Sequence, residues 1–232
     1  MNVNIQIVNK TIKGTLNLSG SKSISNRLLI FQALSEQSTK FKNISDSDDT
    51  LVLQKALSSS DTFIDVGIAG TAMRFLTAYY ALRASEVVLT GASRMKQRPI
   101  KGLVDALSSL GADIKYMEKE GYPPLKIKGK SLEGGMLQIK SDISSQFISA
   151  LLMVGPYFEK GLQLELIGAV ISRPYIEMTL NLMKKQGASY QWEGHKIYIP
   201  PGGYQTNISQ VESDWSSISY LFELVALSDT GS

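Results

Sequence analysis

The segment SDISSQFISALL, residues 141–152, decides the fold, because the chain carries a close copy of it, SDWSSISYLFEL, at residues 213–224. A second pair, TGASRMKQRPIKGLVDALSSLGAD and IGAVISRPYIEMTLNLMKKQGAS, occupies residues 90–113 and 167–189. A fainter copy opens the chain with SGSKSISNRLLIFQAL from residue 19, followed by GTAMRFLTAYYAL from residue 70. Self-similarity of this kind indicates one structural unit that is used several times.

Each copy predicts the same order of elements. Small hydroxyl residues lead a helix with apolar residues at helical spacing, a strand follows, and an Arg-Pro pair starts a second helix that a glycine ends. Two short strands with alternating polarity close the unit, separated by loops rich in proline and glycine. The expected strands are residues 86–89, 125–128, 136–139, 162–167, 196–199 and 207–211. The sequence therefore predicts a mixed α/β (α+β) fold in which three β-α-β-α-β-β units surround one core.

Two terminal segments lie outside these units. Residues 3–8 alternate between apolar and polar side chains and are expected to form a strand. A helix from Ser216 to about Ala226 begins a further copy that the chain does not complete, as in an unfinished protein. We expect its apolar side chains, among them Ile218 and Leu221, to pack against the first strand or a neighbouring molecule, because a large exposed apolar patch is unusual.

The composition excludes several classes of protein and site. Of the 232 residues, 43% are hydrophobic and 19% charged, which is typical of a globular protein, and no run reaches the roughly 20 apolar residues that span a bilayer. With no cysteine and a single histidine, His195, the chain lacks thiolate chemistry and the usual ligands of a zinc site. A net charge of +3 without a basic stripe argues against nucleic acid. We expect a cytoplasmic protein with no metal, cofactor, nucleic acid or membrane partner.

Four segments place hydroxyls, glycines or cations where helices are expected to begin. The free backbone N–H groups and the positive dipole end of a helix N-terminus attract anions. These segments are residues 21–27 (SKSISNR), 67–74 (GIAGTAMR), 94–100 (RMKQRPI) and 144–146 (SSQ), the last with a repeat partner at 172–175 (SRPY). Helix capping is enough to explain the serines and threonines, but not the cations beside them. The added cations and second hydroxyls favour a site for small anions.

The first segment illustrates the chemistry. If the helix begins near Ser23, then Ser23 and Arg27 lie four residues apart on one face, with Lys22 beside them. Arg27 and Ser23 can bind a carboxylate, while Lys22 supplies a mobile charge or a proton. Ser144 and Ser145 at another helix start suit a phosphate group.

Taken together, the segments resemble the 5-enolpyruvylshikimate-3-phosphate synthases. The resemblance rests on SGSKSISNR, GxAGTAMR, RMKxRPI, SSQF, ISRPYI and VESDWSSxSY in the family's order, and runs from about Ile12 to Tyr220. It implies an enolpyruvyl transferase of two domains, each built from three such units, with the substrates between them. On this basis residues 1–12 are expected to be a strand of the second domain, residues 13–211 the shikimate-3-phosphate-binding domain, and residues 212–232 the start of the second domain, whose remainder is the missing partner.

The resemblance also implies an activity and a set of site residues. The family transfers the enolpyruvyl group of phosphoenolpyruvate to the 5-hydroxyl of shikimate 3-phosphate and releases phosphate, a step of chorismate and aromatic amino-acid biosynthesis. It assigns shikimate 3-phosphate to Lys22, Ser23, Arg27, Ser144, Ser145, Gln146, Ser172 and Tyr175. It assigns phosphoenolpyruvate to Lys22, Gly70, Thr71, Arg98 and Gln146. Lys22 is the catalytic candidate, for proton transfer. The family's acid–base carboxylates lie in the other domain, so this half is expected to bind substrate without turnover.

Two residues depart from the family's pattern. Ile68 stands where the family usually has Asn, and Phe75 where many members have Pro, which leaves inhibitor sensitivity open. Asp48 or Asp49 is expected either to orient Lys22 and its neighbours or to cap a helix.

Two other functions remain as alternatives. The sister enolpyruvyl transferase that acts on UDP-N-acetylglucosamine shares the fold, but it has Asn directly after the lysine, where this chain has Ser23, and it normally uses a cysteine acid. A non-catalytic module that binds a phosphorylated metabolite is the alternative from another class, and a reading frame that continues past Ser232 would argue against it.

Overall fold

The computed structural model describes residues 11–35, 40–141, 143–170, 172–205 and 210–231. Its centre contains two four-stranded sheets with the same topology. The first sheet has the order β2-β3-β5-β4, from β2 (Phe63–Asp65), β3 (Glu86–Thr90), β4 (Asp113–Tyr116) and β5 (Leu125–Lys128). The second has the order β6-β7-β9-β8, from β6 (Gly135–Lys140), β7 (Leu162–Ile167), β8 (Gln191–Glu193) and β9 (Lys196–Ile199). In each sheet the first pair is parallel and the other two pairs are antiparallel.

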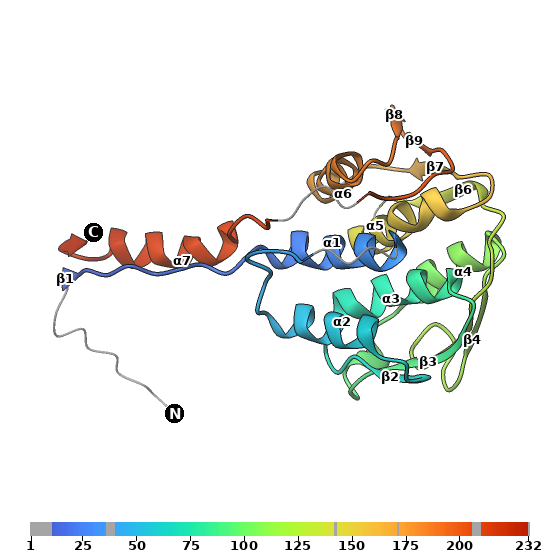
Figure 1. The fold of residues 1–232 in the computed structure, drawn as a ribbon, viewed down its shortest axis with the longest axis horizontal. Helices are drawn as coiled ribbons and strands as arrows, with labels where there is room; N and C mark the ends of the chain where they lie inside the picture. Colours follow the sequence, from blue (N-terminus) through green and yellow to red (C-terminus); the bar gives the residue numbers. More distant parts are fainter. Residues whose placement is uncertain (1–10, 36–39, 142, 171, 206–209, 232) are drawn as a thin grey trace.

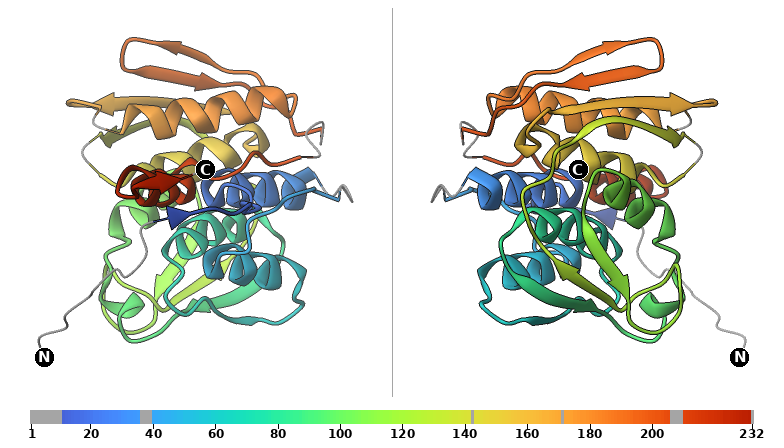
Figure 2. Two further views of the ribbon diagram at one scale, coloured as in Figure 1. Left: turned by 90° about the vertical axis from the view of Figure 1, so that its left-hand side faces the viewer. Right: turned by 90° about the vertical axis from the view of Figure 1, so that its right-hand side faces the viewer.

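The central helices lie between the two sheets. Figure 2 shows the sheets at opposite sides of the molecule, with α1, α3 and α5 between them. Alternation along the strands explains this arrangement, since β5 (LKIK) buries its leucine and isoleucine and exposes its two lysines. The helices are α1 (Lys22–Ser35), α2 (Asp48–Ser58), α3 (Gly70–Leu82), α4 (Lys101–Ser109), α5 (Ser145–Val154), α6 (Arg173–Lys185) and α7 (Trp215–Ala226).

The core is shared by all of the central helices. Helix α3 is buried at nearly every position from Ala72 to Ala81, and α5 is buried from Phe147 to Val154. A helix that is apolar on all sides needs cover on all sides, which the two sheets and the neighbouring helices provide. The ends of α3 and α5 are therefore held firmly in place, and their N-termini face the same region.

The predicted unit occurs twice in complete form. The first copy is β2-α3-β3-α4-β4-β5 and the second is β6-α5-β7-α6-β8-β9, so the predicted fold class is confirmed. Gly111 and Gly187, with φ of +101° and +88°, follow the ends of α4 and α6 as expected for C-terminal glycines. The grouping of residues 70–82 with the opening copy was wrong, because α3 belongs to the unit of the first sheet.

The start of α4 also differs from the prediction. Arg98 and Pro99 precede the helix, which begins at Lys101. Arg98 instead follows a short 3-10 helix, Met95–Gln97, and has an extended conformation with ψ of 119°. A residue before proline tends to avoid the α conformation, and Arg98 follows this tendency. Its repeat partner Arg173, which also precedes a proline, nevertheless begins α6.

The opening copy is a pair of helices, α1 and α2, without a sheet of its own among the described residues. It joins the end of the chain through two isolated bridges, Gly20 with Ser213 and Lys42 with Gln210. The strand expected at 207–211 falls largely outside the described residues, and Gln210 forms one of these bridges. The strand expected at 3–8 lies outside them entirely.

Helix α7 projects away from the two sheets (Figure 1). None of its side chains is buried, and Trp215, Tyr220 and Phe222 are 76%, 70% and 58% exposed. The short strand β1 (Thr11–Ile12) pairs in parallel with β10 (Thr230–Gly231), so the beginning of the described chain runs beside α7. The expected burial of the apolar side chains of this helix is therefore absent within the described part of the chain.

Candidate functional site

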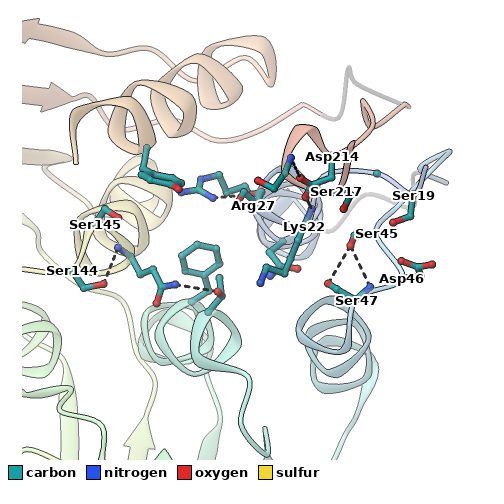
Figure 3. A pocket seen from close by; sticks show the side chains of 18 of the residues that line it. Ser19, Lys22, Arg27, Ser45, Asp46, Ser47, Ser144, Ser145, Asp214 and Ser217 are labelled. Atoms are coloured by element: carbon teal, nitrogen blue, oxygen red, sulfur yellow. Dashed lines mark hydrogen bonds between the residues drawn. The ribbon is translucent and has the colours of Figure 1, made fainter. Parts of the chain in front are cut away.

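A pocket of about 850 Å³ opens at the N-terminal ends of α1, α3 and α5. Figure 3 shows Ser144 and Ser145 on one side of it, Lys22 with Ser45 and Ser47 on the other, and Arg27 between them. The predicted residues that line it are Lys22, Ser23, Arg27, Thr71, Arg98, Ser144, Ser145, Gln146 and Tyr175. Repetition explains this convergence, since equivalent helices of adjacent units begin at equivalent places.

Arg27 is the buried cation of the pocket, with 4% of its surface exposed. Its Nη1 donates to the backbone carbonyl of Ser23 at 2.7 Å, its Nε to Thr179 Oγ1 at 2.8 Å, and its Nη2 to Ser149 Oγ at 3.0 Å. These partners are all neutral, and the described residues supply no carboxylate to Arg27. A buried charge without a counter-ion is costly, so the site is arranged to receive an anion.

The surroundings of Arg27 keep it charged at neutral pH. Burial lowers the pKa of Arg27 to about 10, and the neighbouring Tyr175 opposes that shift. The Phe75 ring lies 5.6 Å from the guanidinium carbon, where its face attracts a cation. Phe75, one of the two residues noted in the sequence as departures, is thus part of the Arg27 environment.

The start of α5 forms the second part of the site. Ser144 is the N-cap, and its Oγ accepts a hydrogen bond from the Gln146 backbone N–H at 3.3 Å, so the capping function is present. The side chain of Gln146 then donates to Thr71 Oγ1 at 3.2 Å, which joins α5 to the start of α3. Ser145 adds a further hydroxyl at the same N-terminus. This end of the pocket offers hydroxyls and the positive end of a helix dipole to an anion.

Arg98 reaches the pocket because Gly70 lacks a side chain. A Cβ on Gly70 would lie 2.4 Å from Arg98 Nη1 and 2.6 Å from Nη2, closer than any contact allows. The second buried arginine, Arg74, donates from Nη1 to the Gly70 carbonyl at 2.9 Å. Burial, followed by the repulsion of Arg98, lowers the pKa of Arg74 to about 10, while Asp49 opposes the shift. The α3 end thus concentrates positive charge.

Comparison with known proteins identifies the family of the chain. The family model described as EPSP synthase (3-phosphoshikimate 1-carboxyvinyltransferase) matches residues 8–60 and 52–231. The chain belongs to the EPSP synthase family. A 3-phosphoshikimate 1-carboxyvinyltransferase of Bacteroides fragilis is 51% identical over 94% of this chain and 53% of its own length. One of Haemophilus influenzae is 42% identical over 93% of this chain and 57% of its own length.

A solved structure agrees with this assignment. The EPSP synthase of Acinetobacter baumannii superposes with a TM-score of 0.77 at 25% sequence identity, over 91% of this chain and 52% of that one. The chain therefore spans about half the length of the EPSP synthases that it matches.

Two of the residues predicted from the EPSP synthase resemblance lie outside the pocket lining. Gly70 is buried behind Arg98, where it acts through its small size. Ser172, in the described segment 172–205, is the N-cap of α6 and makes no capping bond with its side chain. Tyr175, one turn further along α6, does line the pocket and is 49% exposed.

Asp48 and Asp49 were expected either to orient Lys22 and its neighbours or to cap a helix, and the structure places both at a helix start. Asp48 and Asp49 lie in the first turn of α2, where acidic residues favour the helix dipole, and Asp49 accepts from the Thr71 backbone N–H at 3.4 Å. Asp214 is the carboxylate near Lys22, since its Oδ2 accepts from the Lys22 backbone N–H at 3.3 Å. Asp214 also caps α7. Asp214 has the same position in its repeat copy, SDWSS, as Asp142 has in SDISS, and this repetition is the signal that could have marked it as a candidate.

Other pocket residues of this EPSP synthase chain were not anticipated. Asn26, Ser45, Asp46 and Ser47 line the side nearest α2. Asn26 lies in α1, whereas Ser45, Asp46 and Ser47 depend on the fold of the segment between α1 and α2, for which the sequence has no repeat partner.

The described part of the chain has neither a metal centre nor a membrane-spanning helix. No group of three or more His, Cys, Asp or Glu residues is placed to hold a metal ion there. Among the described helices, none combines the length and the apolar character needed to traverse a bilayer.

Proposed function

We propose that this chain binds shikimate 3-phosphate and phosphoenolpyruvate, as part of an enzyme that transfers the enolpyruvyl group to the 5-hydroxyl of shikimate 3-phosphate and releases phosphate. Arg27 carries the proposal, because it is a buried guanidinium that faces the pocket with no carboxylate partner among the described residues. The names of the relatives, 3-phosphoshikimate 1-carboxyvinyltransferase, support the same reaction.

In this proposal shikimate 3-phosphate lies across the pocket. Its carboxylate binds Arg27, because two N–H groups on one guanidinium match two carboxylate oxygens. Its 3-phosphate binds Ser144 and Ser145 at the start of α5, with Ser172 as a third hydroxyl. Tyr175 packs on the ring, and its exposed side chain has room to do so.

Phosphoenolpyruvate is assigned to the ends of α1 and α3. Lys22, Thr71, Arg98 and Gln146 line that part of the pocket, and Gly70 allows Arg98 to approach. Fixed cations there would stabilise the charge that develops during the transfer. Lys22 is the proposed proton-transfer group.

The proposal includes a division of the chain. Residues 13–211 form the shikimate-3-phosphate-binding domain, and residues 1–12 and 212–232 belong with a second domain. The exposed apolar side chains of α7 support this division, because a helix that belongs to another domain need not contact the two sheets.

The test is a titration of the 232-residue chain with shikimate 3-phosphate, followed by amide NMR shifts. We expect saturable binding at millimolar or lower concentration, with shifts at the N-termini of α1 and α5, because both anionic groups of the ligand meet prepared donors. Shikimate, which lacks the phosphate, is expected to bind more weakly. UDP-N-acetylglucosamine is the control and is expected to cause no shifts. An absence of shifts with millimolar shikimate 3-phosphate would refute the proposal.

A further inference from the structure

Two hydroxyl groups behind the pocket hold Arg27 in place. Thr179 on α6 and Ser149 on α5 are both fully buried, and their oxygens lie 2.9 Å apart. Arg27 donates to both of them, from Nε at 2.8 Å and from Nη2 at 3.0 Å. Neither Thr179 nor Ser149 lines the pocket, so they contact Arg27 on the side away from the ligand.

The hydrogen bonds of this pair have one consistent direction. A threonine hydroxyl has a single proton, and Thr179 donates it to the carbonyl of Tyr175 at 2.8 Å. Ser149 must then be the donor in its bond to Thr179. The remaining lone pairs of both oxygens are left to accept from Arg27. The pair is therefore committed to the guanidinium in one orientation.

The geometry leaves part of the guanidinium for a ligand. A guanidinium has five N–H groups, and the described residues accept three of those of Arg27, through Thr179, Ser149 and the Ser23 carbonyl. Two N–H groups remain, and Arg27 lines the pocket. Because all three acceptors are neutral, they fix the orientation without neutralising the charge. A carboxylate in their place would fix it equally well but compete with the substrate.

We propose that Thr179 and Ser149 are positioning residues, which act on substrate binding through Arg27. The inference rests on the proposed function, in which Arg27 binds the carboxylate of shikimate 3-phosphate. It predicts that loss of either hydroxyl weakens recognition of the carboxylate and leaves recognition of the phosphate unchanged. A purely structural function would weaken both equally.

The test compares two ligands, shikimate 3-phosphate and its methyl ester, which lacks the carboxylate charge. For each variant of the 232-residue chain, calorimetry or NMR gives the dissociation constants of both ligands. The quantity compared is the dissociation constant of the methyl ester divided by that of shikimate 3-phosphate. Thr179→Val keeps the shape of the side chain, removes the hydroxyl, and is expected to reduce this ratio about tenfold, the effect of one misplaced charge-assisted hydrogen bond. Thr179→Ser keeps the hydroxyl and is expected to retain the parent ratio.

The chain offers a matched control in Thr77. This residue is also fully buried in a helix, and its Oγ1 donates to the carbonyl four residues earlier, Met73, at 2.7 Å, as Thr179 does to Tyr175. Thr77→Val therefore makes the same chemical change without touching Arg27, and is expected to keep the parent ratio.

The outcomes separate the inference from the proposed function. If Thr179→Val weakens the binding of both ligands by the same factor, or changes neither, the ratio stays at the parent value and the positioning function is refuted. If Thr179→Val fails to fold, Ser149→Ala provides the same comparison, and an unchanged ratio there refutes it too. Arg27→Ala tests the assignment beneath it: an unchanged ratio in that variant means that Arg27 does not bind the carboxylate, whatever Thr179 does.

Discussion

Arg27→Ala is expected to weaken the binding of shikimate 3-phosphate about a hundredfold. In the proposed complex the buried guanidinium is the charged partner of the carboxylate, and a hydrogen-bonded charge pair of this kind contributes about 1.5–3 kcal/mol, close to two powers of ten. Screening by salt does little to reduce this contribution, because Arg27 is 4% exposed. Titration calorimetry on the parent and the variant measures the change.

Two further variants exclude simpler explanations. Arg27→Lys keeps the charge but loses the forked geometry, so an intermediate loss of about tenfold is expected. Arg83→Ala removes an arginine that packs over the Tyr79 ring, 5.8 Å away and outside the pocket, and is expected to leave affinity unchanged. The melting temperature of Arg27→Ala should stay near that of the parent, because the lost desolvation cost of a buried cation without a counter-ion offsets the lost hydrogen bonds and the cavity that alanine leaves. Unchanged affinity in a folded Arg27→Ala variant would contradict the assignment.

Gly70→Ala is expected to weaken the binding of phosphoenolpyruvate about tenfold while the affinity for shikimate 3-phosphate stays within about twofold of the parent. The new Cβ would lie 2.4 Å from Arg98 Nη1, so the guanidinium has to move. Arginine is flexible, which makes the movement inexpensive for folding but misplaces a charge in the site. Phosphorus NMR titration with phosphoenolpyruvate, in the presence of saturating shikimate 3-phosphate, measures the effect.

The control for this variant is Gly102→Ala. Gly102 lies in α4, and its added Cβ would meet only Phe147 ring carbons at 3.6 Å, an ordinary van der Waals distance. It makes the same change of glycine to alanine in a helix without displacing a cation, so phosphoenolpyruvate affinity should remain at the parent value. Equal affinity of the parent and Gly70→Ala would show that Arg98 does not contact phosphoenolpyruvate.

The parts of the fold that the sequence predicted well are those with a local signal. The strands predicted at 125–128, 162–167 and 196–199 coincide with β5, β7 and β9. Each of them alternates between buried and exposed side chains or lies between proline and glycine turns. The predicted start of α4 was wrong because a proline has two effects on a helix. It is tolerated in the first helical turn, and it also disfavours the α conformation of the residue before it. Only the surrounding structure decides whether the helix begins before or after such a proline.

The opening copy shows where local signals end. Gly20 and Ser213 form a bridge across a separation that no pattern of neighbouring residues can reveal. The opening copy has no described sheet of its own because its pairing partners, Gln210 and Ser213, come from the far end of the chain.

The site was predictable where it depends on helix starts. Ser23, Thr71 and Ser145 could be placed together because repeated units bring their helix N-termini to one region. Ser149 and Thr179 could not, because each is a single small polar residue on the buried face of its helix. In a sequence, such residues do not differ from those that only bond their own backbone.

The exposure of α7 has a consequence for how the chain unfolds. None of its side chains contributes to the core, and helices of about its length are marginal in water without tertiary packing. The core and α7 therefore form two cooperative units, joined through the crossing of Gly20 with Ser213. The helix can lose and regain its structure many times while the two sheets stay intact, so a free energy of unfolding measured on the sheets describes them alone.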